Sequence, residues 1–373
     1  MSRPHVVVIG AGVIGLSTAI KLKEAGYRVS LVARDFPGDP KCIEFTSPWA
    51  GAHHVSVATG ADMRLHQFDA RTFQVMSELI EQDPGVPLHF AKQVEYREIP
   101  KVEGAAGEVS QLNLISRFQP NFRWLDEADL PEGIAHGATF TCIQIDTPAY
   151  LPYLLARFRS KGGKTFRTST LSSFLSALSA DPTLGDAQLV VNCTGLGSLS
   201  LTNDDKVFPT RGQLVIVRAP WVKIGMTRLG PNGVYDYTIP RRNGLVVLGG
   251  CAEKNNWDPR PRKDMSDRIK TRCLALCPDL LPPEKRNGGT IDDLDVVEEA
   301  VGLRPTREGG IRLDVEEMHD GSSGRTIRIV HHYGHGGYGY QSSWGSAEAA
   351  VELVDRVLGR RDRYASSQRS ARL

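Results

Sequence analysis

The chain has 373 residues, of which 40% are apolar and 24% charged, and its 45 basic residues against 43 acidic ones leave a formal charge of +2. At about 150 residues per domain, this length predicts two domains or one large α/β unit, with enough core to fold without disulfides or metals. The composition argues against a disordered chain, a collagen and a coiled coil, and the near-neutral charge argues against a dedicated binder of nucleic acid or anionic lipid.

The N-terminus shows the pattern of a βαβ unit. Residues 5–9 form a short apolar run, typical of a buried parallel strand, and a GxGxxG motif follows at once at residues 10–15. A helical period of apolar residues then runs to about Gly26, and residues 28–32 indicate a second strand. Arg3 and the apolar run also resemble a secretory signal, but the glycines interrupt that run and favour a dinucleotide-binding unit.

Each glycine of the motif has its own physical role. Gly10 makes the tight turn from strand to helix, Gly12 lets the backbone approach a pyrophosphate, and Gly15 lets helix and strand pack closely. The helix N-terminus adds backbone donors and a partial positive charge for the phosphates. The residues predicted to bind a dinucleotide here are Gly10, Ala11, Gly12, Val13, Ile14 and Gly15.

The position expected to bind the ribose is displaced. Ala33 stands where an acidic residue usually ends the second strand, and the nearest acid is Asp35, preceded by Arg34. We predict that the Asp35 carboxylate accepts hydrogen bonds from the ribose hydroxyls, while Arg34 binds phosphate or stacks on adenine. An NADP phosphate bound by Arg34 is the alternative at this point.

Further strands of the same parallel type are expected at residues 189–191, which lead to Thr194 and Gly195, and at 327–330, which lead to a glycine-rich stretch. A helix is predicted over residues 345–358 from its 3.6-residue apolar period. The regions 60–140 and 205–300 instead indicate a mixed or antiparallel sheet. The predicted fold is therefore α/β, with a discontinuous Rossmann-like domain (1–56, 145–204, 304–358), a substrate-binding domain with a mixed, largely antiparallel sheet (57–144, 205–303), and a disordered tail (359–373).

Neither cysteines nor histidines indicate a metal site. The six cysteines include no CxxC pair and no Cys/His pattern with zinc spacing, and such sparse use fits a reducing compartment. His331, His332 and His335 lie close together in sequence. We interpret this cluster as packing and hydrogen bonding rather than as a metal centre, and no metal is predicted.

Four motifs together identify a family. They are SPWAGA at 47–52, YTIPR at 237–241, VGLRP at 301–305, and the stretch from His331 to Gly345. These motifs resemble the D-amino-acid oxidase family, which includes D-aspartate oxidase, in its fungal type. The resemblance covers the chain from Val6 to about Leu358, and the combination is specific although no single motif would suffice.

The resemblance implies bound FAD and oxidation of a D-amino acid by hydride transfer from its Cα to flavin N5. The imino acid then hydrolyses to a 2-oxo acid and ammonia, while dioxygen reoxidises the flavin and yields hydrogen peroxide. No catalytic acid or base of the protein is expected if the amine arrives neutral. In this sequence Arg304 and Tyr237 match the residues that hold the substrate carboxylate, and Gly337 matches the carbonyl that receives the amine.

The cofactor contacts are carried over in the same way. The segment with Thr194 and Gly195 is similar to the ATG-type turn of FAD enzymes, and Leu171 matches a backbone contact to adenine. The remaining matches are Ala50, Gly51 and Ala52, which face flavin N5, and the loop Gly336, Gly337, Tyr338, Gly339, Tyr340 and Gln341, which lies near the pyrimidine edge.

One departure from the family concerns substrate choice. Relatives often carry a Tyr or, in D-aspartate oxidases, an Arg where this chain has Cys251 and Ala252. We therefore predict a preference for neutral D-amino acids, with His54 lining the pocket. D-aspartate oxidase remains the alternative, in which Arg228, in a lid expected at 225–235, supplies the second positive charge. The alternative of another class is a dinucleotide-binding module without oxidase chemistry.

The C-terminal residues predict a subcellular location. Ala371, Arg372 and Leu373 form a small-basic-Leu tripeptide similar to the Ser-Lys-Leu peroxisomal signal. The preceding tail is rich in Arg, Ser and Gln and has too few apolar residues to fold. The expectation is a protein of the peroxisomal matrix recognised by an import receptor, with D-amino acid and dioxygen as small-molecule partners, no nucleic acid and no membrane, and a homodimer left open.

Overall fold

The computed structural model describes residues 3–58, 63–98, 111–168, 171–231, 235–319, 324 and 326–360. The chain folds into two compact units. Unit 1 comprises Met1–Ser47, Leu151–Phe208 and Pro305–Leu373, and unit 2 comprises Pro48–Tyr150 and Pro209–Arg304. The boundaries differ most from the prediction at the first crossing, because residues 48–56 belong to unit 2 and not to the nucleotide-binding unit. The tail from residue 361, with its predicted signal, lies outside the described residues.

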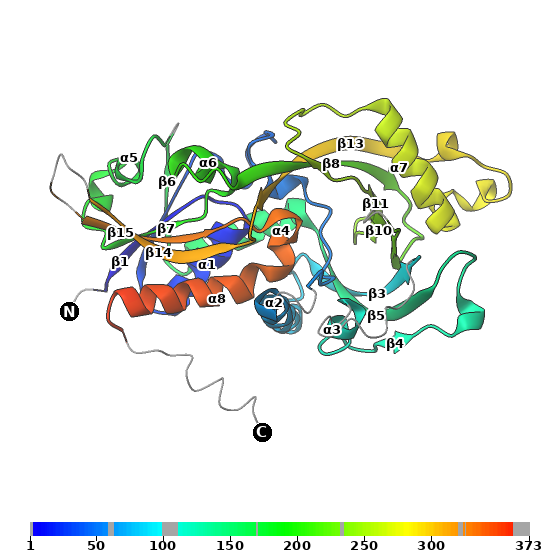
Figure 1. Cartoon of the computed structure of the whole chain (residues 1–373), viewed down its shortest axis with the longest axis horizontal. Helices are drawn as coiled ribbons and strands as arrows, with labels where there is room; N and C mark the ends of the chain where they lie inside the picture. The colour runs from blue at the N-terminus through cyan, green and yellow to red at the C-terminus, as the bar shows by residue number, and fades with distance from the viewer. Residues whose placement is uncertain are drawn as a thin grey trace, which may run out of the picture. The chain divides into compact units, whose positions relative to one another are not determined.

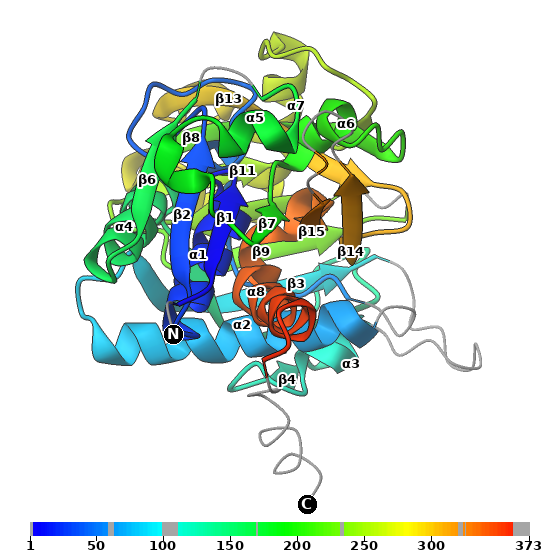
Figure 2. The same ribbon diagram turned by 90° about the vertical axis from the view of Figure 1, so that its left-hand side faces the viewer.

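Unit 1 is built on a six-stranded sheet in the order β14-β15-β7-β1-β2-β6, which can be followed across Figure 2. The pairings among β15, β7, β1, β2 and β6 are parallel, and β14 joins β15 antiparallel. The strands are β1 (His5–Ile9), β2 (Arg28–Ala33), β6 (Lys164–Arg167), β7 (Leu189–Asn192), β14 (Arg312–His319) and β15 (Thr326–Tyr333). Strand order reverses on either side of β1, which is where doubly wound sheets bind ligands at their carboxyl ends.

Helices cover both faces of this sheet. In Figure 1, α1 (Val13–Glu24) and α8 (Gly339–Val357) lie on one face, and α5 (Phe174–Leu178) and α6 (Ser198–Leu201) lie on the other. Phe174 and Leu178 of α5 pack with Val7, Val190 and Ile329 of three strands. A strand that is covered on both faces needs apolar side chains on both. This explains the run of apolar residues after His5 in β1, which is wholly buried.

Unit 2 is built on a nine-stranded sheet in the order β12-β8-β11-β10-β9-β3-β5-β4, with β13 beside β8. Its resolved pairings are antiparallel except β3 with β9. The strands are β3 (Leu88–Arg97), β4 (Arg123–Trp124), β5 (His136–Ile145), β8 (Val207–Arg218), β9 (Gly225–Leu229), β10 (Tyr235–Pro240), β11 (Leu245–Gly249), β12 (Glu253–Lys254) and β13 (Val296–Arg307). The helices are α2 (Met63–Gln82), α3 (Gln111–Ile115) and α7 (Lys263–Leu276), and α4 (Thr147–Ser160) crosses the unit boundary.

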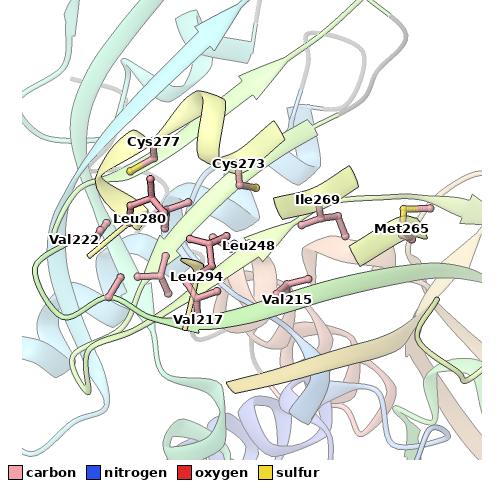
Figure 3. Packing of buried hydrophobic residues seen from close by; sticks show 13 residues of the cluster. Val215, Val217, Val222, Leu248, Met265, Ile269, Cys273, Cys277, Leu280 and Leu294 are labelled. Carbon is pink, nitrogen blue, oxygen red and sulfur yellow. The ribbon is translucent and has the colours of Figure 1, made fainter. Parts of the chain in front are cut away.

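The two faces of the unit 2 sheet have different neighbours. Val215, Val217 and Leu248 point toward α7 and form a buried core with Ile269 and Cys273 (Figure 3). Because side chains alternate along a strand, Leu214 and Ile216 point the other way, where they form a second apolar cluster with Ile239 and Val247. Tyr237 packs against this second cluster, so the predicted substrate residue lies on the face away from α7.

The predicted fold is confirmed: unit 1 is Rossmann-like and unit 2 carries a mixed, largely antiparallel sheet. One local prediction was wrong. The helix expected from residue 345 begins at Gly339 and follows a short 3-10 turn over Gly336–Tyr338, so the predicted loop 336–341 is helical. The segment 225–235, expected to form a lid, contains β9 and the start of β10; residues 232–234 lie outside the described residues, and the lid stays a prediction. No helix among the described residues is long and apolar enough to cross a membrane.

Candidate active site

The predicted phosphate-binding turn joins β1 to α1 in unit 1. Gly10 has a φ of +105°, a conformation that residues with a side chain rarely adopt, and a Cβ there would lie 2.5 Å from the Cys193 carbonyl oxygen. A Cβ on Gly15 would lie 1.8 Å from the carbonyl oxygen of Gly10. Strand β1 and helix α1 therefore pack with backbone against backbone at these glycines, as the spacing of the motif predicts.

The N-terminus of α1 suits an anion. Its first turn holds no acidic residue, and Gly12 at the N-cap offers no capping side chain. The Ser47 hydroxyl accepts a hydrogen bond from the Val13 amide at 3.1 Å, and the Tyr340 hydroxyl donates to the Ser47 carbonyl oxygen at 2.8 Å. Backbone donors and the helix dipole favour a pyrophosphate here, so these residues fit a dinucleotide. Ser47 was not predicted, although its motif at 47–52 was the signal.

Arg34 and Asp35 follow β2 and pair with each other. Arg34 Nε donates to Asp35 Oδ2 at 2.8 Å, and the Arg34 carbonyl oxygen accepts a bond from Arg167 at 2.8 Å. The Arg167 guanidinium lies 5.1 Å from the ring centroid of Phe36. A guanidinium already paired with a neighbouring carboxylate is less suited to an additional phosphate, which weakens the NADP alternative. The ribose and adenine contacts of Asp35 and Arg34 stay predictions.

The turn after β7 is held by a polar network that the sequence did not reveal. Asn192 is fully buried, and its Oδ1 accepts bonds from the Thr194 amide at 3.1 Å and from the Thr194 hydroxyl at 2.8 Å. Asn192 Nδ2 lies 3.3 Å from Ser198 Oγ, and Gly195 has a φ of +58°. This network fixes the predicted Thr194–Gly195 turn. Leu171, the predicted adenine contact, packs at the margin of the apolar cluster under α5.

The three histidines near β15 are buried and are bonded to different partners. His331 Nε2 lies 3.0 Å from Glu316 Oε2, and His332 Nδ1 lies 3.0 Å from Thr18 Oγ1. His335 Nε2 lies 3.1 Å from Ser346 Oγ. Burial lowers the pKa of His331 and of His332, so both rings are neutral near pH 7. Among the described residues, no cluster of His, Cys, Asp or Glu is arranged to hold a metal ion.

Tyr237 and Arg304 lie together in unit 2 over a floor of glycines. A Cβ on Gly249 would lie 2.2 Å from Tyr237 Cζ, and a Cβ on Gly212 would lie 2.5 Å from Arg304 Nη2. Arg304 Nη1 donates to the Cys251 carbonyl oxygen at 2.8 Å. Burial raises the pKa of Tyr237, and the nearby charge of Arg304 opposes that shift. A protonated phenol beside a guanidinium fork is an arrangement that can hold a carboxylate.

Residues 50–52, predicted to face flavin N5, lie in unit 2 on the same side of its sheet. A Cβ on Gly51 would lie 3.1 Å from Val247 Cγ1 and 3.2 Å from Ile239 Cδ1. The Thr147 hydroxyl donates to the Ala50 carbonyl oxygen at 2.8 Å, and Ala52 has a φ of 55°. The segment is thus pressed onto the apolar cluster around Val247, and its contact with a flavin stays a prediction.

The two adjacent histidines of unit 2 differ in position. His54, predicted to line the pocket, is fully buried, with its ring edge-on to Phe73 and Phe118. His53 instead lies beside Tyr237, with ring centroids 6.3 Å apart, and burial lowers the pKa of His53 to about 4. His53 is therefore the neighbour of the Tyr237 ring, and the role of His54 in lining the pocket stays a prediction.

Arg228 is not placed to supply a spare charge. It lies on β9, where Nη2 bonds to Asp236 Oδ2 at 3.1 Å and Nε lies 3.4 Å from Glu98 Oε1. Asp236 is 2% exposed and also binds Arg272. Ala252 is exposed and contributes only a methyl group. The predicted absence of an arginine at 252 is thus not offset by Arg228.

Comparisons with known proteins agree with this geometry. The family model for FAD-dependent oxidoreductases matches residues 5–353. A D-aspartate oxidase from Cryptococcus neoformans var. grubii is 37% identical, with 94% of this chain and 96% of the relative covered. A D-amino-acid oxidase from Fusarium vanettenii is 34% identical, with 94% and 97% covered. The solved structure of a glycine oxidase from Geobacillus kaustophilus has a TM-score of 0.65 at 18% identity over 98% of each chain, which shows the shared fold.

The family match spans the nucleotide-binding motif at 10–15, the glycine floor of unit 2 and the VGLRP motif at 301–305. The backbone cradle at α1 fits the pyrophosphate of the cofactor that defines this family. The chain belongs to the family of FAD-dependent oxidoreductases, and its cofactor is FAD.

Proposed function

We propose that the protein oxidatively deaminates D-amino acids to 2-oxo acids, ammonia and hydrogen peroxide. The observation that carries the proposal is the pair formed by Tyr237 and Arg304, which lie side by side over Gly249 and Gly212 in a member of an FAD-dependent family. Relatives that are 31–37% identical over 94% of this chain are named D-aspartate oxidase or D-amino-acid oxidase. FAD, when bound, supplies the electron acceptor for the substrate Cα–H and passes the electrons to dioxygen.

The side chains of the protein bind and orient the substrate. Arg304 offers a planar, permanently charged fork that can take both carboxylate oxygens, and its bond to the Cys251 carbonyl oxygen fixes the plane of that fork. The Tyr237 hydroxyl donates a further hydrogen bond, and its raised pKa keeps it protonated through neutral and mildly alkaline pH. The proposed acceptor of the substrate amine is the backbone carbonyl of Gly337.

No side chain is required as a general base when the amine arrives neutral. His53 is a titratable side chain beside Tyr237, and with a pKa of about 4 it is uncharged at neutral pH. We assign it to the wall of the site, where its neutral ring excludes water from the hydrogen-bonded carboxylate.

For the substrate side chain we propose a preference for neutral D-amino acids. With Ala252, the chain has no cation at the position where an arginine would bind an acidic substrate side chain. The Arg228 guanidinium is already shared between Asp236 and Glu98. Acidic substrates are the second candidate, because the Cryptococcus relative at 37% identity is a D-aspartate oxidase.

One experiment tests activity and preference together. Anaerobic addition of D-Ala, D-Met or D-Val should bleach the flavin absorbance, whereas the L-enantiomers should leave it unchanged. Comparing kcat/KM for these substrates with that for D-Asp then decides the preference. Absence of bleaching with every D-amino acid would refute the oxidase proposal, and a tenfold preference for D-Asp would refute the neutral preference alone.

The peroxisomal location stays a prediction, because residues 371–373 lie outside the described residues. Deleting these three residues should leave activity intact and move the protein from peroxisomes to the cytosol. Import of the truncated protein, or failure of the full chain to enter, would show that the tripeptide is not a signal.

A further inference from the structure

Arg211 is a fully buried arginine on β8 that lies outside the carboxylate-binding pair. All of its guanidinium nitrogens are bonded. The acceptors are the Asp258 carbonyl at 2.9 Å, Glu253 Oε2 at 2.9 Å, Gln213 Oε1 at 3.0 Å and the Arg260 carbonyl at 2.6 Å. The fork thus ties the segment 253–260 to β8, which is more than a single ion pair would do.

Gln213 extends the attachment by one step along the strand. Its Nε2 donates to the Arg262 carbonyl and to Ser266 Oγ, both at 2.8 Å, and its Oε1 also accepts from the Arg262 amide at 2.9 Å. The Gln213 amide lies 3.1 Å from Cys251 Sγ. Arg211 and Gln213 together therefore hold a continuous stretch from Cys251 to Arg262 in place.

The residue between them serves the opposite face of the strand. Side chains alternate along β8, so Gly212 faces away from Arg211 and Gln213. Arg304 rests on Gly212, where a Cβ would lie 2.6 Å from its Cζ, and its Nη1 bonds to the carbonyl oxygen of Cys251. Two of the groups that contact the Arg304 guanidinium, Gly212 and the Cys251 carbonyl oxygen, are therefore backbone that the network of Arg211 and Gln213 holds.

We propose that Arg211 is a positioning residue for substrate binding, acting with Gln213 through Gly212 and Cys251 to hold the plane of the Arg304 guanidinium. The inference rests on the proposed function, in which Arg304 binds the substrate carboxylate. A tilted fork makes one good hydrogen bond where an aligned fork makes two, and the carboxylate is bound in the ground state and in the transition state alike. Loss of the network should therefore weaken binding and leave the limiting rate nearly unchanged.

The test uses the FAD-loaded protein and propionate, a carboxylate of substrate size that has no amine to oxidise. Calorimetry gives the Kd of propionate, and steady-state assays with D-Ala give KM and kcat. Arg211→Lys keeps the charge beside Glu253 but cannot reach both the Asp258 and the Arg260 carbonyls. It should raise the propionate Kd and the KM for D-Ala about fivefold to tenfold, with kcat changed less than about twofold.

Two further variants keep the test decisive. Gln213→Leu removes the bonds to Arg262 and Ser266 and should raise the same two constants in the same direction, which decides the matter if Arg211→Lys fails to fold. Arg272→Lys is the matched control, because it alters an ion pair with Asp236 on the α7 side that touches neither Cys251 nor Gly212. It should leave Kd, KM and kcat unchanged within about twofold.

The outcomes separate this inference from the proposed function. If Arg304→Lys binds propionate as the unaltered protein does, the assignment of Arg304 to the carboxylate is wrong. If Arg304→Lys binds it poorly while Arg211→Lys and Gln213→Leu bind it normally and lose only thermal stability, the network is structural and the positioning role is wrong. Weaker binding in all three variants, with kcat kept in the last two, supports it.

Discussion

The two units build their binding sites from different parts of the chain. In unit 1 the cradle at Gly10 and Gly15 and the N-terminus of α1 consist of backbone, and they leave no room for side chains. In unit 2 the glycines form only the floor, and the side chains of Tyr237 and Arg304 lie on it. In the proposed assignment, a cofactor shared by many reactions is bound by main chain, whereas the substrate is bound by side chains.

The largest effect should come from unit 2. Arg304→Ala removes the fork that takes the carboxylate, and loss of one partner of a desolvated charge pair costs roughly 2–5 kcal/mol, which is about thirtyfold to nearly four orders of magnitude in kcat/KM. FAD should stay bound, because its phosphate cradle lies in unit 1. Flavin absorbance and steady-state kinetics of the same preparation check both statements. Loss of FAD from this variant would contradict the assignment of cofactor binding to unit 1 and of carboxylate binding to unit 2.

Gly15→Ala tests the other side of the comparison. The new Cβ would lie 1.8 Å from the Gly10 carbonyl oxygen, so α1 must move away from β1 and from the phosphates. We expect the Kd for FAD to rise at least about tenfold, measured by flavin fluorescence on reconstitution. Gly185→Ala is the matched control, because its nearest contact would be an ordinary 3.4 Å. Equal FAD affinity in both variants would contradict the role of the cradle.

Ala252→Arg should change substrate choice without disturbing unit 1. An arginine at this exposed position supplies the cation that the predicted pocket lacks, so the ratio of kcat/KM for D-Asp to that for D-Ala should rise about tenfold. Ala252→Gln, a shorter polar side chain without charge, is the control. If both variants shift the ratio equally, polarity rather than charge decides it. If neither does, position 252 does not face the substrate.

The smallest effect concerns acid stability. Burial lowers the pKa of His53 to about 4 from the ordinary value of 6.5, so the unfolded chain binds more protons than the fold between these values. Stability should therefore fall as the pH drops below 6.5, by about 1–2 kcal/mol at pH 5 from this residue. His53→Asn should lose less stability than the unaltered protein between pH 7 and pH 5, measured as the shift of the urea midpoint. An equal loss in both proteins would show that His53 is not buried uncharged.

The N-terminal βαβ unit could be predicted from sequence because each of its signals is local. The apolar run, the glycine spacing and the second strand follow one another within the first 33 residues, and β1 occupies the predicted residues 5–9. The later parallel strands were found for the same reason. The start of α8 was missed because glycine-rich residues 336–341 are typical of a loop, whereas in the structure Tyr340 and Trp344 are buried in the first turns of the helix.

The side chains around the substrate could not be placed from sequence for a different reason. His53 and His54 are neighbours, and the sequence does not say which of two adjacent side chains points toward Tyr237. Arg228 is neutralised by Asp236, whose position opposite it depends on the pairing of β9 with β10. Asn192 and Arg211 act through partners far away in sequence or through backbone atoms, and no residue pattern indicates such contacts. For Ser47 the motif at 47–52 marks the segment but does not indicate the contact with the Val13 amide.

The interleaved order of the segments bears on how the protein is synthesised. β1 and β2 leave the ribosome first, but β7 pairs with β1 only after residue 192 has been translated, and β15 completes the parallel sheet only after Tyr333. Until then the buried strand β7 has β1 on one edge but lacks β15 on the other. Nascent chains halted between residues 192 and 333 should therefore be more exposed to proteolysis and more dependent on chaperones than the full-length chain.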